Sequence, residues 1–192
     1  PMLYYKTKEE IELIRISSLL VGKALAEVAK VIRPGISTLA IDKIADEFIN
    51  DNKAKPAFKG YNGFPNALCI SVNEQVVHGI PGKYELKEGD IVSVDCGVLM
   101  NDYYGDSAYT FAVGEIDDAK KKLLQVTYDC LYKGIEMAVV GKRVGDIGEA
   151  VQSYAEGNGF SVVRELVGHG VGKELHEAPE VPNYGRKGVG PK

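Results

Sequence analysis

Apolar residues recur at helical spacing through the first fifty positions of the chain. Thr7 and Glu10 form the pattern of a capping box, and apolar side chains then recur every three or four residues until the Pro-Gly pair at 34–35. This pattern predicts a long amphipathic helix. A second helix is predicted at 38–50, and its inner face is formed by Ile41, Ile44, Ala45, Phe48 and Ile49.

Shorter stretches with strand character follow the two helices. We expect a loop at 53–63, and alternating apolar and polar residues then predict strands at 67–72, 74–77, 91–98 and 108–113. Helices followed by a run of antiparallel strands predict an α+β fold in which the helices cover one face of the sheet.

The same order of elements starts again after Gly114. Helices are predicted at 118–140 and 146–156, separated by Gly141, and a strand at 161–167. A constant offset of 106 residues sets Ile41 on Ile147, Ala45 on Val151, Phe48 on Tyr154 and Gly35 on Gly141. We therefore predict a single domain, residues 1–192, with two related halves at about 1–113 and 114–192.

The stretch SVDCGVLMNDYYGDSAYTF, residues 93–111, predicts a β-hairpin with one aspartate on each strand. If Met100 and Asn101 form the turn, Asp95 and Asp106 are directly opposed, with their Cβ atoms about 4.5–5.5 Å apart. Two such carboxylates repel unless one is protonated or a cation lies between them, and oxygen ligands suit a divalent metal. From the hairpin alone, two solvated acids and a metal site remain equal alternatives.

The internal repeat also predicts where a second acidic hairpin should fall. The offset places the equivalents of Asp95 and Asp106 near positions 201 and 212, whereas the sequence ends at Lys192. We therefore expect a chain cut before its second pair of carboxylates.

Each of the three histidines lies beside a glycine-rich turn. His78 stands in QVVHGIPG, and His169 and His176 stand in VGHGVGKELHEAP, where the glycines disfavour a helix and permit close approach of a ligand. A histidine in such a turn is often a hydrogen-bonded structural residue. Combined with Asp95 and Asp106, however, one imidazole would give a donor set suited to a divalent metal.

Composition and charge narrow the class of protein. The 192 residues are 45% hydrophobic, enough for one sizeable core, and carry a net charge of −4 without a concentrated Lys/Arg tract. Short basic runs at 120–122 and 186–187 are expected to be solvated, so we expect no nucleic-acid partner. No apolar run reaches the roughly 18 residues of a membrane span and no signal peptide is evident, so we expect a cytoplasmic protein without membrane contact. The three cysteines form no CxxC motif, which is typical of reduced thiols.

Three segments together resemble the type I methionine aminopeptidases, and the resemblance runs along the whole chain. They are NGFPNALCISVNEQVVHGIPG, LKEGDIVSVDCGVLMNDYYGDSAYTFAVG and LVGHGVGKELHEAPEVPNYG. The resemblance implies the pita-bread fold, two related α+β halves around a metal pair. It also implies a set of site residues: Asp95, Asp106 and His169 as ligands of two divalent ions (Co, Mn, Fe or Zn), His78 and His176 as catalytic, substrate-contacting histidines, and Tyr61, Phe64 and Cys69 as lining of the methionine pocket.

The implied reaction is hydrolysis of the bond after an N-terminal methionine on peptides and nascent chains, with the ribosome as a further expected partner. In such enzymes two metal ions about 3.5–4 Å apart activate a shared water and stabilise the developing negative charge. His176 would hydrogen-bond the scissile carbonyl and His78 the scissile amide.

The chain departs from this family at its end. Members carry two further metal-ligating glutamates on strands that follow the segment PNYGRKGVGPK, where this sequence stops. About three of five protein ligands are therefore present, and we expect weak metal binding, open apolar surface and little activity. Two other functions stay open: a non-catalytic pita-bread module that binds peptides or proteins, and a prolidase-like peptidase acting on X-Pro bonds.

Overall fold

The computed structural model describes residues 2–192, which form two compact units. One, called here the hairpin unit, contains Tyr5–Asp117 together with Val171–Leu175. The other, called here the histidine unit, contains residues 2–4, Asp118–Gly170 and His176–Lys192. The division falls close to the predicted boundary at 113, although the segment 171–175 belongs to the first unit. Residue 1 lies outside the described residues, and the single domain remains a prediction.

Two capped helices open the hairpin unit. Helix α1 spans Lys8–Ala29, and its capping box is confirmed, since the Thr7 hydroxyl accepts from the amide of Glu10 while the Glu10 carboxylate accepts from the amide of Thr7. The helix ends five residues before Pro34, so the predicted continuation is wrong. Helix α2 spans Thr38–Asp51, as predicted within one residue, and is capped by Ser37.

The sheet of this unit is antiparallel and is centred on its longest hairpin. Strand β3 (Ile91–Met100) pairs with β4 (Tyr103–Ala112) along its whole length and with β2 (Leu68–Val72) and the short β1 (Lys55–Pro56). The loop expected at 53–63 therefore contains β1, and a 3-10 turn, η1, at Tyr61–Gly63. The strand expected at 74–77 is absent, because the chain turns at Asn73 in a left-handed conformation and Val76 and Val77 are exposed.

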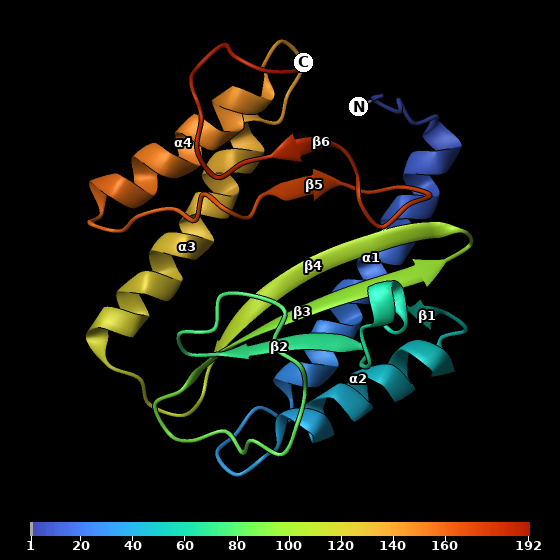
Figure 1. Ribbon diagram of the computed structural model, residues 1–192, viewed down its shortest axis with the longest axis vertical. Helices are drawn as coiled ribbons and strands as arrows, with labels where there is room; N and C mark the ends of the chain where they lie inside the picture. Colours follow the sequence, from blue (N-terminus) through green and yellow to red (C-terminus); the bar gives the residue numbers. More distant parts are fainter. Residues whose placement is uncertain (1) are drawn as a thin grey trace. The chain divides into compact units, whose positions relative to one another are not determined.

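Helices α1 and α2 cover one face of this sheet (Figure 1). Alternate residues of β3, Val92, Val94, Cys96 and Val98, are fully buried against them with Leu68, Val28, Ile41 and Ile49. Because side chains alternate across a strand, the residues between these, Ser93, Asp95 and Gly97, lie on the other face. The alternation thus turns the aspartate away from the apolar core.

The histidine unit contains two packed helices and a small sheet. Helix α3 spans Asp118–Met137 and α4 spans Val144–Gly157, while β5 (Gly168–Gly170) pairs with β6 (Glu177–Val181). The strand predicted at 161–167 is not formed, because pairing begins only at Gly168. Among the described residues, no helix has the length and apolarity needed to cross a membrane.

The predicted repeat is confirmed by the second helix of each unit. Displaced by 106 residues, the first and last residues of α2, Thr38 and Asp51, fall on those of α4, Val144 and Gly157. The glycines that precede the two helices share a left-handed backbone, with φ of 89° at Gly35 and 90° at Gly141. Glycine adopts this conformation without the steric penalty of a Cβ atom.

Candidate functional site

Asp95 and Asp106 lie on the same face of the β3–β4 hairpin but are not directly opposed. The turn is formed by Asn101 and Asp102, with φ of 53° and 64°, so Asp95 faces Ala108 and Asp106 faces Gly97. The predicted turn at Met100 and Asn101 is wrong, because a two-residue hairpin turn of this type needs two residues that tolerate positive φ, as Asn and Asp do. The correction shifts the register by two positions, which leaves both aspartates on one face.

The two carboxyl groups interact directly. Burial, followed by the charge of Asp106 and a hydrogen bond with it, raises the pKa of Asp95 to about 8. A hydrogen bond between two carboxyl groups requires a proton on one of them, so the pair retains one proton near neutral pH.

The two carboxyl groups also affect Cys69, which is paired with Asp95 across β2 and β3. Burial and the nearby carboxylates raise the pKa of this thiol to about 12. Cys69 therefore stays a protonated, buried thiol beside the acids, which argues for a packing role and against a nucleophile.

The aspartates fit a divalent cation as donors, because a cation can take the place of their shared proton and oxygen ligands suit such ions. Within residues 2–192, no three His, Cys, Asp or Glu side chains are gathered closely enough to hold a metal. The structure thus assembles two of the three predicted ligands in one unit, while the third, His169, belongs to the other.

His169 and His176 lie together in the histidine unit. Their ring centroids are 4.2 Å apart, and the planes are inclined by 47°. His169 lies on β5 and its Nδ1 is 2.9 Å from the carbonyl oxygen of Gly170, whereas the exposed His176 precedes β6. Pairing of β5 with β6 closes the loop between the two histidines and so brings their rings into contact.

The loop between these histidines packs in the hairpin unit. The amide of Tyr104 donates to the carbonyl of Gly172 at 2.8 Å, and Leu175 is only 2% exposed. Leu175 completes a small apolar cluster on the acid face of the sheet with Ala57, Phe58, Cys69, Phe64 and Tyr104.

Two of the three predicted pocket residues belong to that cluster. Phe64 and Cys69 pack within it, whereas Tyr61 is 39% exposed. Phe58 also belongs to the cluster, although the sequence did not predict it as a site residue. The glycine at position 97 is the feature that could have indicated it, because a Cβ atom there would come within 2.7 Å of the Phe58 ring. The missing side chain opposite Asp106 leaves room for this ring.

His78 has the most constrained backbone of the predicted site residues. It is exposed and adopts a φ of 60°, the left-handed region that costs a non-glycine residue about 1–3 kcal/mol. Such a conformation persists only where neighbouring contacts hold it. The structure places His78 in the hairpin unit, on the segment that follows β2.

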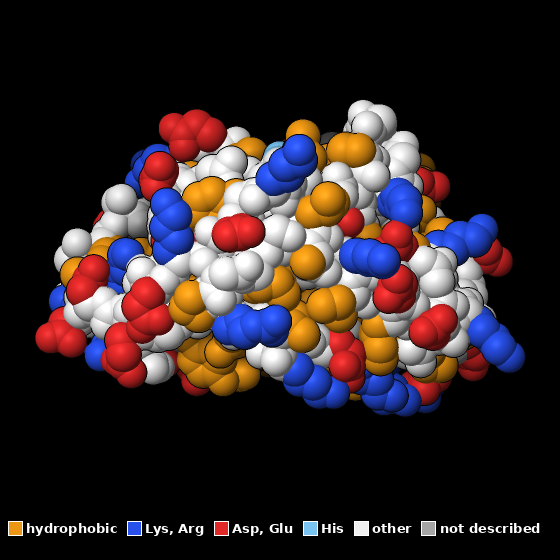
Figure 2. All heavy atoms as spheres, turned by 90° about the horizontal axis from the view of Figure 1, so that it is seen from below, with side chains coloured by type: hydrophobic (Ala, Val, Ile, Leu, Met, Phe, Trp, Pro, Cys, Tyr) orange, Lys and Arg blue, Asp and Glu red, His pale blue; other side chains and the backbone are white. Residues whose placement is uncertain are grey.

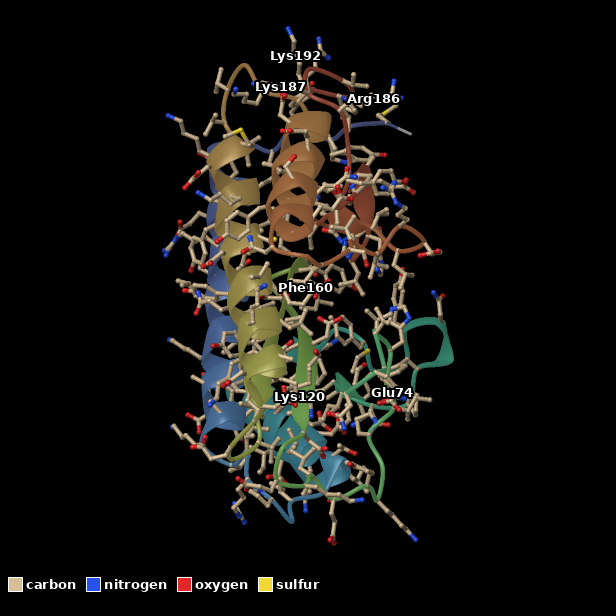
Figure 3. All side chains as sticks on the ribbon, turned by 90° about the vertical axis from the view of Figure 1, so that its left-hand side faces the viewer. Glu74, Lys120, Phe160, Arg186, Lys187 and Lys192 are labelled. Carbon is tan, nitrogen blue, oxygen red and sulfur yellow. The ribbon has the colours of Figure 1, made fainter. Side chains whose placement is uncertain are left out.

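Charged side chains are mixed over the surface. Lys/Arg and Asp/Glu side chains alternate across the face shown in Figure 2. Lys120 and Arg186, which represent the two basic runs, lie at opposite ends of the histidine unit in Figure 3. The two runs therefore do not merge into one basic patch.

Comparison with known proteins identifies relatives along the whole chain. The profile of metallopeptidase family M24 matches residues 12–190. The methionine aminopeptidase of Clostridium perfringens is 52% identical over 191 residues, which is 100% of this chain and 77% of that protein.

Solved structures agree with this relationship. The methionine aminopeptidase of Rickettsia prowazekii superposes with a TM-score of 0.97 at 40% identity, covering 98% of this chain and 76% of that one. The prolidase of Pyrococcus furiosus is more distant, with a TM-score of 0.83 at 25% identity and 53% of its chain covered.

Proposed function

This chain belongs to metallopeptidase family M24, and one of its methionine aminopeptidase relatives is 52% identical to it. We propose that the chain removes methionine from the N-termini of peptides and newly made proteins by hydrolysis. The observation that carries the proposal is the identity of 52% across the full length of the chain. The chain has the pita-bread fold of these relatives, and the M24 family implies a divalent metal cofactor.

We propose that two divalent ions are held through Asp95, Asp106 and His169. The register that sets Asp95 and Asp106 on one face of the hairpin supports this assignment, and so does the raised pKa of Asp95, since a cation can replace the proton that this pKa implies. When bound, such ions would activate water and stabilise negative charge on the substrate carbonyl. Manganese, iron, cobalt and zinc all suit these ligands.

The remaining predicted residues orient the substrate in this proposal. His176 donates a hydrogen bond to the scissile carbonyl as it gains negative charge, and His78 contacts the scissile amide. The cluster of Phe64, Cys69 and Leu175 beside the acids offers apolar surface for a methionine side chain, with Tyr61 at its exposed side.

The proposed substrates are short peptides and nascent chains with an N-terminal methionine, encountered at the ribosome in the cytoplasm. All three cysteines of the chain are free thiols, which agrees with a reducing compartment.

The test is methionine release from a Met-Ala-Ser peptide by the purified chain in excess Mn²⁺, measured beside Asp106→Asn. Turnover by the native chain that the variant lacks supports the proposal. Absence of turnover at saturating Mn²⁺ would agree with the little activity expected of these 192 residues. Absence of turnover also after the strands with the two expected glutamates are restored contradicts the proposal and leaves the non-catalytic binding module, which the same peptide tests through its binding affinity.

An X-Pro peptide separates the remaining alternative. The higher identity to methionine aminopeptidases, 52% against 25% for the prolidase, predicts cleavage of Met-Ala-Ser in preference to Ala-Pro. Faster cleavage of Ala-Pro would instead assign the chain to the prolidase-like class.

A further inference from the structure

The segment that carries His78 is fastened to the hairpin unit at both ends. At its start, where Figure 3 labels Glu74, the side chain of Asn73 donates to Asp90 at 2.9 Å and accepts from the amide of Ile91. At its far end, the Thr38 hydroxyl exchanges hydrogen bonds with the amide and carbonyl of Gly82. Between these anchors, Val76, Val77 and His78 are exposed.

One residue inside this exposed stretch touches the sheet. The carbonyl of Gly79 accepts from the amide of Ile70 at 2.8 Å, and its amide donates to the hydroxyl of Ser71 at 3.1 Å. A Cβ atom at Gly79 would collide with the carbonyl oxygen of Ile70, so only glycine can come this close to β2. The residue after His78 is therefore held by two hydrogen bonds.

Ser71 lies on the acid face of the sheet. It alternates with Cys69 along β2, and Cys69 is paired with Asp95, so all three side chains are on one face. Ser71 is 3% exposed, and its hydroxyl satisfies an amide that is also buried. This bond attaches the His78 segment beside the aspartates.

We propose that Ser71 is a positioning residue for His78: by holding the amide of Gly79, its hydroxyl keeps His78 in the left-handed conformation and fixes where the imidazole leaves the chain. The importance of that orientation for catalysis rests on the proposed function, whereas the orientation itself does not. Without the hydroxyl, the Gly79 amide is a buried donor without its acceptor, and the segment is free to relax toward ordinary φ values.

The first test is structural and uses the metal-free chain. In Ser71→Ala, we expect the Gly79 amide to exchange with solvent about 10- to 100-fold faster, as loss of a buried hydrogen bond implies. We also expect the strong intraresidue Hα–HN cross-peak of His78, a signature of positive φ, to weaken. Ser17→Ala is the matched control, because Ser17 is also fully buried and bonds the carbonyls of Met100 and Tyr103. It should leave both signals unchanged.

The second test is kinetic and uses the Mn²⁺-loaded chain. Ser71→Ala should lower kcat for Met-Ala-Ser by about 10-fold or more with a smaller change in KM, and it should have no further effect in a His78→Ala background. If Ser71→Ala does not fold, Ser71→Cys is measured instead, since a thiol fills the space of the hydroxyl with a somewhat larger atom but accepts hydrogen bonds weakly.

Unchanged exchange at Gly79 and an unchanged His78 signal would overturn the proposal, as would an equal loss of kcat with His78 already removed. If the native chain shows no turnover, the exchange and cross-peak measurements, which need no activity, still decide whether Ser71 positions His78.

Discussion

Asp95 and Asp106 lie diagonally across β3 and β4, and the pKa of Asp95, raised to about 8 by burial and by Asp106, predicts that the pair holds one proton near neutral pH. A divalent cation bound by these two carboxyl groups would release that proton, because a carboxylate ligand must be deprotonated. The energetic consequence is that burial and mutual repulsion of the acids oppose folding whenever both are ionised.

The shared proton predicts a pH dependence of both stability and metal binding. The folded-state pKa of Asp95, about 8, lies above its ordinary value of 3.8, so the folded chain binds this proton more tightly than the unfolded chain does. The resulting contribution to the free energy of unfolding is complete below pH 4 and is lost as the pH rises through 8. The metal-free chain should therefore lose stability across this range, while Mn²⁺ should bind more tightly as the pH rises toward 8. Denaturant unfolding and calorimetric titration measure the two effects.

Asp106→Asn is the control for this prediction. The neutral amide removes the repulsion that helps to raise the pKa of Asp95, so the pH dependence of stability should flatten. Mn²⁺ binding to the native chain at pH 6 that releases no proton, in two buffers of different ionisation enthalpy, would contradict the shared proton.

His176 gives a second prediction at the scale of one residue. If it donates to the developing oxyanion, His176→Ala should lower kcat by about 100- to 1000-fold while the bound Mn²⁺ changes little. Kinetics and metal analysis of the same sample measure both quantities. Loss of bound metal with a normal rate in excess Mn²⁺ would assign His176 to metal binding instead.

At the scale of elements, close backbone approach fixes how the hairpin meets α1. Gly105 of β4 lies against the backbone of Ser17 and Ser18, where a Cβ atom would come within 2.6 Å of the Ser18 amide nitrogen. The hydroxyl of Ser17 also donates to the carbonyls of Met100 and Tyr103 at the hairpin turn. The position of Asp106, one residue after Gly105, depends on this contact.

Gly105→Ala should therefore destabilise the chain by about 1–3 kcal/mol, because neither backbone can yield without moving a whole element. The matched control is Gly157→Ala at the end of α4, where nothing lies within 4 Å of the added atom. This control should be neutral or stabilising by up to about 1 kcal/mol. Equal unfolding midpoints of the two variants in urea would refute the close contact as a determinant of stability.

At the scale of the molecule, each unit contains a related pair of helices, but the inner faces of the two pairs are buried to different extents. In the hairpin unit, the sheet buries the inner faces of α1 and α2. In the histidine unit, the inner faces of α3 and α4 line an apolar groove of about 600 Å³. Displaced by 106 residues, buried positions fall on groove positions as follows: Leu20 on Val126, Ala24 on Cys130, Val28 on Gly134, Ile41 on Ile147, Ala45 on Val151 and Ile49 on Ala155.

This groove predicts binding of an apolar dye. Because its lining matches the sheet-covered core of the hairpin unit, 1-anilinonaphthalene-8-sulfonate should bind to the folded chain and fluoresce. Leu131→Glu, within the groove, should reduce this signal, whereas Leu19→Glu, at a similarly exposed leucine of α1, should not. Equal fluorescence from both variants would place the dye elsewhere.

The sequence by itself determined the elements whose signals are local. The capping box of α1, the bounds of α2 and the offset of 106 residues follow from spacing and glycine positions, because backbone preferences act over a few residues. The family and its reaction also follow from the sequence, since three separated motifs carry them. The same local patterns predicted strands at 74–77 and 161–167 that do not form, because a strand also needs a partner.

Only the tertiary structure decided how the site residues meet. The register of β3 and β4 depends on which two residues of the turn take positive φ, and this moved the partner of Asp95 from Asp106 to Ala108. The left-handed backbone of His78 and its attachment through Gly79 to Ser71 were likewise invisible in the sequence. These features arise from contacts between residues on different segments, and the pattern along one segment does not encode them.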